Sequence, residues 1–325
     1  MADNEILKKT LRHYIDLEYY ANGVAEDLDE LLLELYEKCG EAILGTDYLK
    51  TKADYNAVHS VMEDYFSDFQ TELNGRLEKE AETVKENERD FLSTLYGAAL
   101  AVGAIATSKI LFAPFDGRDT VKTFAERSVR NIRRIYDTAL RSGYLFGQKS
   151  SDVKEQADRN LKQITRGINS GITTAIPSFA KTTDRIVFLN NDVEVVYCAV
   201  LDGRTCIVCG NNHGLHYKSL SAAPSIPVHE KCRCCYLKAS DVTEPLPTFD
   251  EFVRSLSDEE QYHILGKGRY ELLKQYDIPL TQFTNNGRTL TLDEVKANLK
   301  LPSNAEESRK AANELFPNEK WIKKG

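Results

Sequence analysis

Apolar residues in the first part of the chain recur at the spacing of an amphipathic α-helix. Within residues 3–38 they lie close to a period of 3.6, at Leu7, Leu11, Tyr14, Ile15, Leu28, Leu31, Leu32 and Leu35. Cys39-Gly40 then supplies a helix stop. A second stripe, within residues 54–90, consists of Val58, Met62, Tyr65, Phe69, Leu73 and Leu77. The pattern predicts an antiparallel helical hairpin over residues 1–90.

Residues 91–184 are expected to continue as a helical region, and they begin with an uncharged run. The 18 residues from Phe91 to Ser108 just reach the length of a membrane span. The run is only mildly apolar, because it contains five Ala, two Gly and four Ser or Thr, and no second span follows. We expect no stable membrane span here. The prediction is a buried helix whose small residues allow close approach to a neighbour.

A basic helix is expected after the turn at residues 115–119. Asp119 or Thr120 can cap it, and its inward face would carry Phe124, Ile132, Ile135 and Leu140. Four arginines at spacings of 3, 4 and 7 lie along one face: Arg127, Arg130, Arg134 and Arg141. Such a stripe can bind DNA phosphates or an acidic protein surface; the alternative is an ordinary solvated face. A further helix is expected from Asp152 toward Gly171, because Asp152-x-x-Glu155 is like a capping box.

From Arg185 onward the pattern is typical of strands. Two runs rich in β-branched and aromatic residues flank residues 190–192, which predicts a β-hairpin. The hairpin and the cysteines that follow form a predicted module over residues 185–242. Thr243–Pro247 marks a boundary, and the tail, 243–325, is expected to hold short helices over 248–256 and 257–274. The fold class predicted is α+β, mainly helical in the N-terminal two-thirds, with a small β-hairpin and a metal-stabilised Cys/His-rich module.

The net charge of the 325-residue chain is −8, so the chain as a whole is not a polycation that coats nucleic acid. The balance differs between segments: −13 over residues 1–90, +8 over 91–240 and −3 over 241–325. The acidic front and the basic middle therefore suggest different neighbours. The first nine residues lack the apolar core of a secretory signal.

Six of the seven cysteines fall between Cys198 and Cys235, and this cluster favours a metal site. Cys-x-x-Cys and His-x-x-Cys, 19 residues apart, are spacings used by structural zinc. The predicted ligands are Cys206, Cys209, His229 and Cys232. Cys234 and Cys235 are alternate ligands, and His213 and His216 are spare candidates. Two alternatives stay open: buried free thiols, and a disulfide formed after release from the cell.

The string LDGRTCIVCGNNHGLHY…IPVHEKCRC resembles the signature of the phage Mu protein F-like family of minor head, or head morphogenesis, proteins. The matching positions are Asp202, Arg204, Thr205, Cys206, Cys209, Gly214, Pro227, His229, Cys232, Arg233 and Cys234. Residues 115–132 and 248–274 also resemble parts of that family, so that the likeness covers about residues 85–300. An Arg-Thr-Glu element that often precedes the hairpin in the family is missing from this chain.

The resemblance implies a minor capsid protein of the virion, in the head interior or near the portal. Such a protein aids assembly and contacts the portal and other capsid or scaffold proteins. It can contact DNA during packaging or ejection, it is expected in several copies per virion, and it passes through the host cytoplasm during assembly. The acidic helices of residues 1–80 lie outside the likeness, and we expect them to dock on other virion proteins.

The sequence carries no convincing catalytic constellation, so we expect no enzyme and no catalytic residues. His229-Glu230 lacks the spacing of His-Glu-x-x-His, and no phosphate-binding glycine loop is present. The main alternative is a zinc-supported phage nuclease acting on DNA, in which His213 or His216, with Asn211 and Asn212, would activate water. A toxin-like effector domain is a weaker alternative, because residues 248–325 are short.

Overall fold

The computed structural model describes residues 5–242 and 244–303, and the chain divides into two compact units. The first, here called the bundle unit, comprises Met1–Val195 and Tyr217–Asp241. The second comprises Val196–His216 and Val242–Gly325. Thr243, at the predicted boundary, and residues 304–325 of the predicted tail lie outside the described residues.

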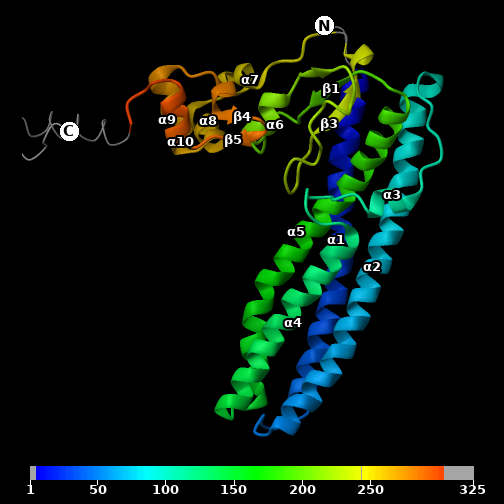
Figure 1. Ribbon diagram of the computed structural model, residues 1–325, viewed down its shortest axis with the longest axis vertical. Coiled ribbons are helices and arrows are strands. Elements are labelled where there is room, and N and C mark those ends of the chain that lie inside the picture. The colour runs from blue at the N-terminus through cyan, green and yellow to red at the C-terminus, as the bar shows by residue number, and fades with distance from the viewer. Residues whose placement is uncertain (1–4, 243, 304–325) are drawn as a thin grey trace, which may run out of the picture. The chain divides into compact units, whose positions relative to one another are not determined.

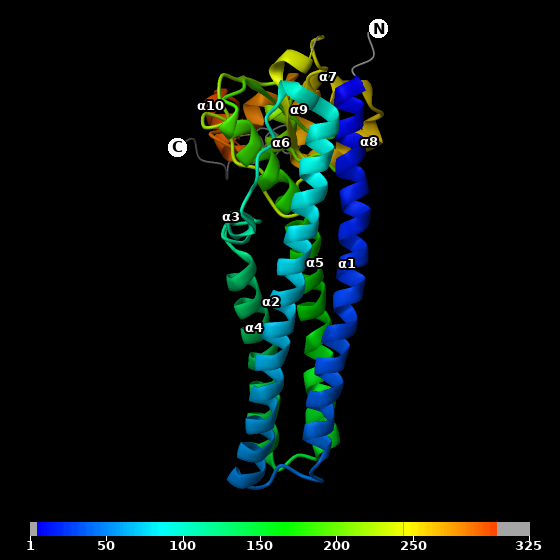
Figure 2. The same cartoon turned by 90° about the vertical axis from the view of Figure 1, so that its right-hand side faces the viewer.

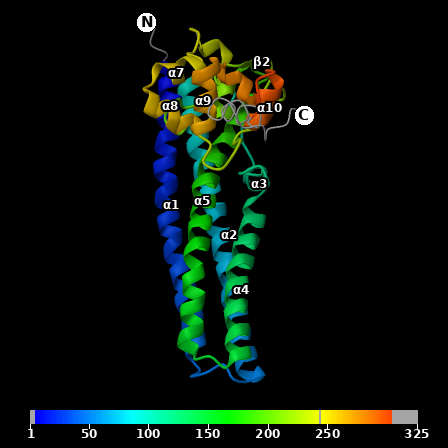
Figure 3. The same ribbon diagram turned by 90° about the vertical axis from the view of Figure 1, so that its left-hand side faces the viewer.

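Four long helices form the bundle unit and lie side by side in all three views (Figures 1, 2 and 3). They are α1 (Glu5–Leu44), α2 (Lys52–Tyr96), α4 (Val121–Phe146) and α5 (Ser150–Asn190). Helix α1 packs along α5 and α2, and α4 packs along the same two helices. The acidic helices α1 and α2 therefore share one hydrophobic core with the basic helix α4. The largest buried side chains of that core include Phe66, Phe124, Tyr136, Phe179 and Phe188.

Local sequence signals account for several helix starts. Thr51 and Asp54 form a capping box at the start of α2. Thr120 caps α4 by accepting a hydrogen bond from the Thr123 N–H, so the prediction of a cap at this position is confirmed. The helix predicted to begin near Asp152 is confirmed, because α5 begins at Ser150, but the expected capping box is absent and α5 continues beyond Gly171 to Asn190.

The predicted helix stop at Cys39-Gly40 is wrong, because α1 continues to Leu44. Both residues are buried, and the lack of a side chain at Gly40 lets Lys154 of α5 approach closely. A Cβ atom at Gly40 would lie 2.7 Å from the Lys154 Cε. Tertiary packing against α5 thus favours a helix through a residue that commonly ends one.

The β-hairpin predicted around residues 190–192 is also wrong. Residues 185–190 are the last turns of α5, and only one strand follows, β1 (Val195–Cys198). The apolar residues Val187 and Phe188 are buried on the helix, because burial in the bundle outweighs a β propensity that depends on context. Strand β1 is the middle strand of a three-stranded sheet, between β2 (His216–Tyr217) and β3 (Cys235–Lys238). A short 3₁₀ turn, η2 (Ala239–Asp241), follows β3.

The buried small-residue helix predicted over residues 91–108 is not formed. Helix α2 ends at Tyr96, and a 3₁₀ turn, η1 (Gly97–Ala99), leads into non-helical chain before α3 (Thr107–Leu111). Most small residues of this segment are exposed, whereas Leu100 and Ile105 are buried. None of the helices in residues 5–242 and 244–303 combines the length and the apolar character needed to cross a membrane.

The second unit contains short elements, labelled in Figure 1. They are α6 (Ile207–Asn212), α7 (Phe249–Ser255), α8 (Asp258–Leu265), α9 (Lys267–Tyr276), η3 (Leu280–Phe283), β4 (Thr284–Asn285), β5 (Arg288–Thr289) and α10 (Leu292–Asn298). Strands β4 and β5 form an antiparallel pair. The short helices predicted for this region are confirmed, with a break at Gly266, whose φ is +71°. The mainly helical α+β class is likewise confirmed.

A chain of buried polar side chains links α1, α2 and α5. His13 Nε2 lies 2.7 Å from Glu88 Oε2, and the Tyr14 hydroxyl donates to Asp184. The Glu88 and Asp184 carboxyl groups share a hydrogen bond. Burial raises the pKa of Glu88 to about 7 and raises the pKa of Asp184 well above its usual range, and burial lowers the pKa of His13. The folded bundle therefore favours neutral forms of all three groups.

Replacing Glu88 with Gln should flatten the pH dependence of the stability of the bundle. The folded chain holds a proton on Glu88 that the unfolded chain loses at a pKa of about 4.3. This contribution to stability is complete below that value and is lost as the pH rises through about 7. Urea unfolding followed by circular dichroism should show wild type losing about 1–3 kcal/mol between about pH 5 and pH 8, and Glu88→Gln losing less.

Glu72→Gln, on the exposed side of α2, is the matched control and should keep the wild-type slope. An equal loss of unfolding free energy in Glu88→Gln and wild type would contradict the assignment.

Candidate metal centre

The first half of the predicted site is built around a tight turn that leads into α6. Asp202 accepts a hydrogen bond from the Arg204 N–H at 2.8 Å, and the Thr205 hydroxyl accepts one from the Asp202 N–H, also at 2.8 Å. This turn places Cys206 at the N-cap of α6, where its Sγ accepts from the Cys209 N–H at 3.4 Å. The backbone donor stabilises a thiolate at Cys206. The Asp-x-Arg-Thr-Cys-x-x-Cys string therefore has a local structural reason.

The second half is a loop of the bundle unit that α5 anchors. The Lys181 ammonium is buried and donates to the carbonyl of Cys232. The Lys231 N–H donates to Thr174 Oγ1 at 3.2 Å. Sequence patterns gave no reason to single out Lys181 or Thr174, because each lies alone in a helix that is remote along the chain. These contacts hold the backbone on both sides of Lys231.

His229 has a defined ligand atom. Its Nδ1 lies 2.7 Å from the carbonyl oxygen of Glu230. Because a carbonyl only accepts, Nδ1 carries the hydrogen and the neutral ring presents Nε2 to a metal. This is the second-shell arrangement that commonly orients a metal-binding histidine.

Two groups of ligand atoms lie among the described residues, one in each unit. The sulfur atoms of Cys206 and Cys209 lie within 4.8 Å of each other in the second unit, and those of Cys232 and Cys234 lie within 4.8 Å of each other in the bundle unit. These Cys and His side chains are therefore placed to bind a metal ion.

The remaining cysteines have other surroundings. Cys235, the second alternate ligand, belongs to neither group; it is buried and acts on the pKa of Tyr14 and Tyr96 of the bundle. Cys39 and Cys198 are buried away from both groups, and burial raises the pKa of each thiol to about 12. All seven cysteines are free thiols.

The spare candidates for water activation are occupied in structural hydrogen bonds. His213 Nδ1 accepts from the Ala199 N–H at 3.0 Å, and burial lowers the pKa of this ring to about 4. The Asn211 amide donates to the Leu280 carbonyl and the Thr284 hydroxyl. His216 lies exposed on β2. Two of these three side chains, His213 and Asn211, are thus held in hydrogen bonds within the second unit.

The four predicted arginines differ in their surroundings on α4. Arg127 is paired with Asp119 at 2.5 Å and holds the turn before the helix. Arg130 and Arg134 are exposed and form no ion pair with any residue in 5–242 or 244–303. Arg141 is exposed, and a hydrogen bond with Tyr55 raises its pKa. Three arginines of the stripe thus remain at the surface.

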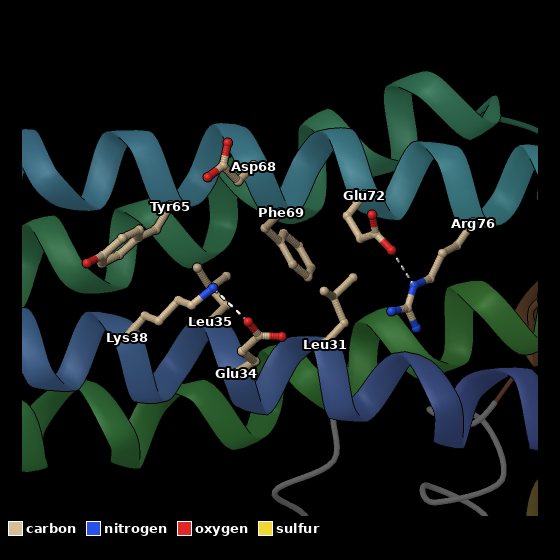
Figure 4. Close-up of a pocket in the computed structure, with 9 residues that line it drawn as sticks. All are labelled: Leu31, Glu34, Leu35, Lys38, Tyr65, Asp68, Phe69, Glu72 and Arg76. Carbon is tan, nitrogen blue, oxygen red and sulfur yellow. Dashed lines mark hydrogen bonds and ion pairs between the residues drawn. The ribbon is translucent and has the colours of Figure 1, made fainter.

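A groove between α1 and α2 encloses a cavity of about 310 Å³. Leu31, Leu35, Tyr65 and Phe69 form its apolar part (Figure 4). On its rim Lys38 pairs with Glu34 at 2.6 Å and Arg76 with Glu72 at 2.7 Å. Asp68 is exposed there. The groove belongs to the surface that the sequence assigned to docking.

Comparison with protein-family models, curated proteins and solved structures finds no match for this chain.

Replacing Cys206 with Ser should reduce the metal bound per chain. The metal content of protein purified without chelator, measured by mass spectrometry of the elements, is expected to fall from about one equivalent to a small fraction. Because binding stabilises the folded form, limited proteolysis should also cut the 217–241 loop faster. Cys198→Ser, a buried thiol outside both groups, is the matched control. Wild-type protein with no bound metal and a protease-resistant loop would contradict the assignment.

Proposed function

We propose that this chain is a non-enzymatic minor head protein, a structural component of a phage virion. In this role it lies in the head interior or at the portal vertex and aids capsid assembly and DNA packaging and delivery. One observation carries the proposal: the Cys/His signature that resembles the phage Mu protein F-like family places two thiols within 4.8 Å of each other in each of its halves, Cys206 with Cys209 and Cys232 with Cys234.

We further propose that the bound metal is zinc and that its role is structural. Thiolates with one imidazole are the ligands that zinc prefers. The signature offers five candidates for four positions: Cys206, Cys209, His229, Cys232 and Cys234. A closed site of this kind contributes folding free energy and has no open position for substrate. With His229, Cys232 and Cys234 among its ligands, the metal would hold residues 217–241.

The charged surfaces of the bundle unit support a role in assembly. The acidic helices α1 and α2 would dock on the portal or on other capsid proteins, with the groove of Figure 4 as the first surface to test. The exposed arginines of α4 would bind an acidic protein surface or DNA phosphates. Because α1 and α2 share the core of the bundle, docking is better tested by surface charges than by deletion.

The nuclease alternative has less support. It requires a histidine free to activate water. The buried hydrogen bond of His213 and the structural bonds of Asn211 speak against that role. His216 is exposed on β2, and the partners that bond His213 and Asn211 do not include it.

The proposal predicts that the chain co-purifies with assembled particles and cuts no DNA. Mass spectrometry of gradient-purified virions should detect it together with the portal protein, and particles carrying Cys206→Ser should contain less of it. Incubation with supercoiled plasmid and Mg²⁺ or Mn²⁺ should leave the plasmid intact. His216→Ala serves as the control variant, with Cys198→Ser for incorporation.

Absence of the chain from particles would overturn the proposed function. Metal-dependent plasmid cleavage that is lost in His216→Ala would establish the nuclease instead.

A further inference from the structure

Two helices of the bundle unit carry opposite charge on opposite edges. Helix α1 contains ten acidic and four basic residues, and α4 contains six basic and two acidic residues. Both helices pack on α2 and α5. Figures 2 and 3, which view the bundle from opposite sides, show α1 at one edge and α4 at the other.

The outermost face of α1 presents a stripe of glutamates, here called the acidic stripe: Glu26, Glu30, Glu37 and Glu41. Spacings of 4, 7 and 4 place them along one line of the helix, opposite the buried Leu28, Leu32, Leu35 and Ile43. All four are exposed and form no ion pair within the described ranges. Leu33 and Leu44 lie on the same line and are 58% and 51% exposed.

The outermost face of α4 presents the counterpart, here called the basic stripe: Arg130, Arg134 and Arg141. Its spacings of 4 and 7 equal those of Glu26, Glu30 and Glu37. Leu145, on the same line, is 71% exposed. Asp137 is the acidic residue nearest to this line, and it is paired with His59 of α2 at 3.2 Å. Each stripe thus combines unpaired or surface charges with an exposed leucine near its C-terminal end.

The two stripes run in the same direction at matching heights. Both α1 and α4 are antiparallel to α5, as residue pairs along α5 show. Toward one end, Asp29 of α1 accepts from Asn169, and Phe124 of α4 packs against Gly171 two residues further on.

Toward the other end, Gly40 of α1 faces Lys154 and Gly143 of α4 faces Val153. The turns that follow α1 and α4 are joined by a β-bridge between Tyr48 and Lys149. Between these ends, Cys39 of α1 shares a side-chain hydrogen bond with Tyr136 of α4. Arg134 is therefore about level with Glu37, and Arg130 and Arg141 each lie within about one helical turn of the levels of Glu30 and Glu41.

We propose that the acidic stripe of one copy of this chain binds the basic stripe of a second copy. Because the stripes are parallel and level, a rotation about an axis along the bundle brings α4 of one copy beside α1 of the next without an axial shift. The contact joins two different surfaces, so it is heterologous and closes into a ring when the rotation closes. The partner is a second copy because the stripes are opposite in charge and their arginines and glutamates lie at similar levels along the bundle.

This inference rests on the bundle alone and stands whether or not the chain is a head protein. It gives the α4 arginines a protein partner, and the arginine spacing and the exposed leucine favour this partner over DNA. A DNA phosphate backbone would satisfy the charges but leave Leu145, Leu33 and Leu44 in water.

Complementary charge variants of the full chain test the proposal. The first variant, Arg130→Glu with Arg134→Glu, disables the basic stripe and leaves the acidic stripe intact. The second, Glu30→Arg with Glu37→Arg, does the reverse. Arg159→Glu with Lys162→Glu, at exposed positions on α5, is the control with the same change in charge. Circular dichroism melting checks that each variant folds.

Sedimentation velocity and light scattering should show that wild type and the α5 control form oligomers as their concentration rises. Raising the salt from about 0.05 to 0.5 M should weaken this association about tenfold or more. Each stripe variant alone should be a monomer. An equimolar mixture of the two stripe variants should associate again, because each of its two kinds of contact joins an acidic stripe to a basic one: one pair is intact and the other is charge-reversed on both sides.

Monomeric wild type at every concentration tested in low salt would overturn the proposal. Folded stripe variants that associate as wild type does, or a mixture of the two that stays monomeric, would also overturn it. A gel shift with duplex DNA adds a further outcome: a monomeric wild type whose DNA binding is lost in Arg130→Glu with Arg134→Glu would assign the basic stripe to DNA instead.

Discussion

The burial of α5 between the other helices is the interaction on which the rest of the bundle unit depends. Its second half is almost continuously buried, from Gly171 to Phe188, and it packs on both α1 and α4. The same helix supplies Lys181 and Thr174, which hold the backbone of the loop that carries His229 and Cys232. A packed helix thus provides a rigid support for half of the candidate ligands, because a buried ammonium that lacked its carbonyl partner would carry a large desolvation cost.

The two halves of the candidate metal site depend on different interactions. A Cys-x-x-Cys turn needs little beyond local hydrogen bonds, and the Asp202–Thr205 turn supplies them. The His-x-x-Cys loop has no such local framework. It depends on α5 and, in our proposal, on zinc. Loss of metal is expected to act on this loop before it acts on the four helices.

The polar side chains of the bundle core have an energetic consequence of their own. Glu88 and Asp184 share a buried position with His13 and Tyr14, and the folded state favours their neutral forms. Buried polar networks weaken a core relative to apolar packing, but they can define which helices pair and in which register. In this bundle the network joins α1, α2 and α5, whereas the opposite charges of the outer faces lie on α1 and α4.

The sequence alone was enough to predict the helices with clear amphipathic stripes, the cap at Thr120 and the short C-terminal helices. It was also enough to predict the Cys/His pairs. Each of these features depends on residues that are close together in the chain. Only the tertiary structure decided the conformation of residues 185–190, which have a strand-like sequence but are helical because they are buried in the bundle. It also decided that α1 continues through Gly40, where Lys154 packs closely. It also decided which cysteines come together and set the acidic and basic stripes on opposite edges. These features depend on contacts between residues that are distant in sequence, and no local pattern encodes such contacts.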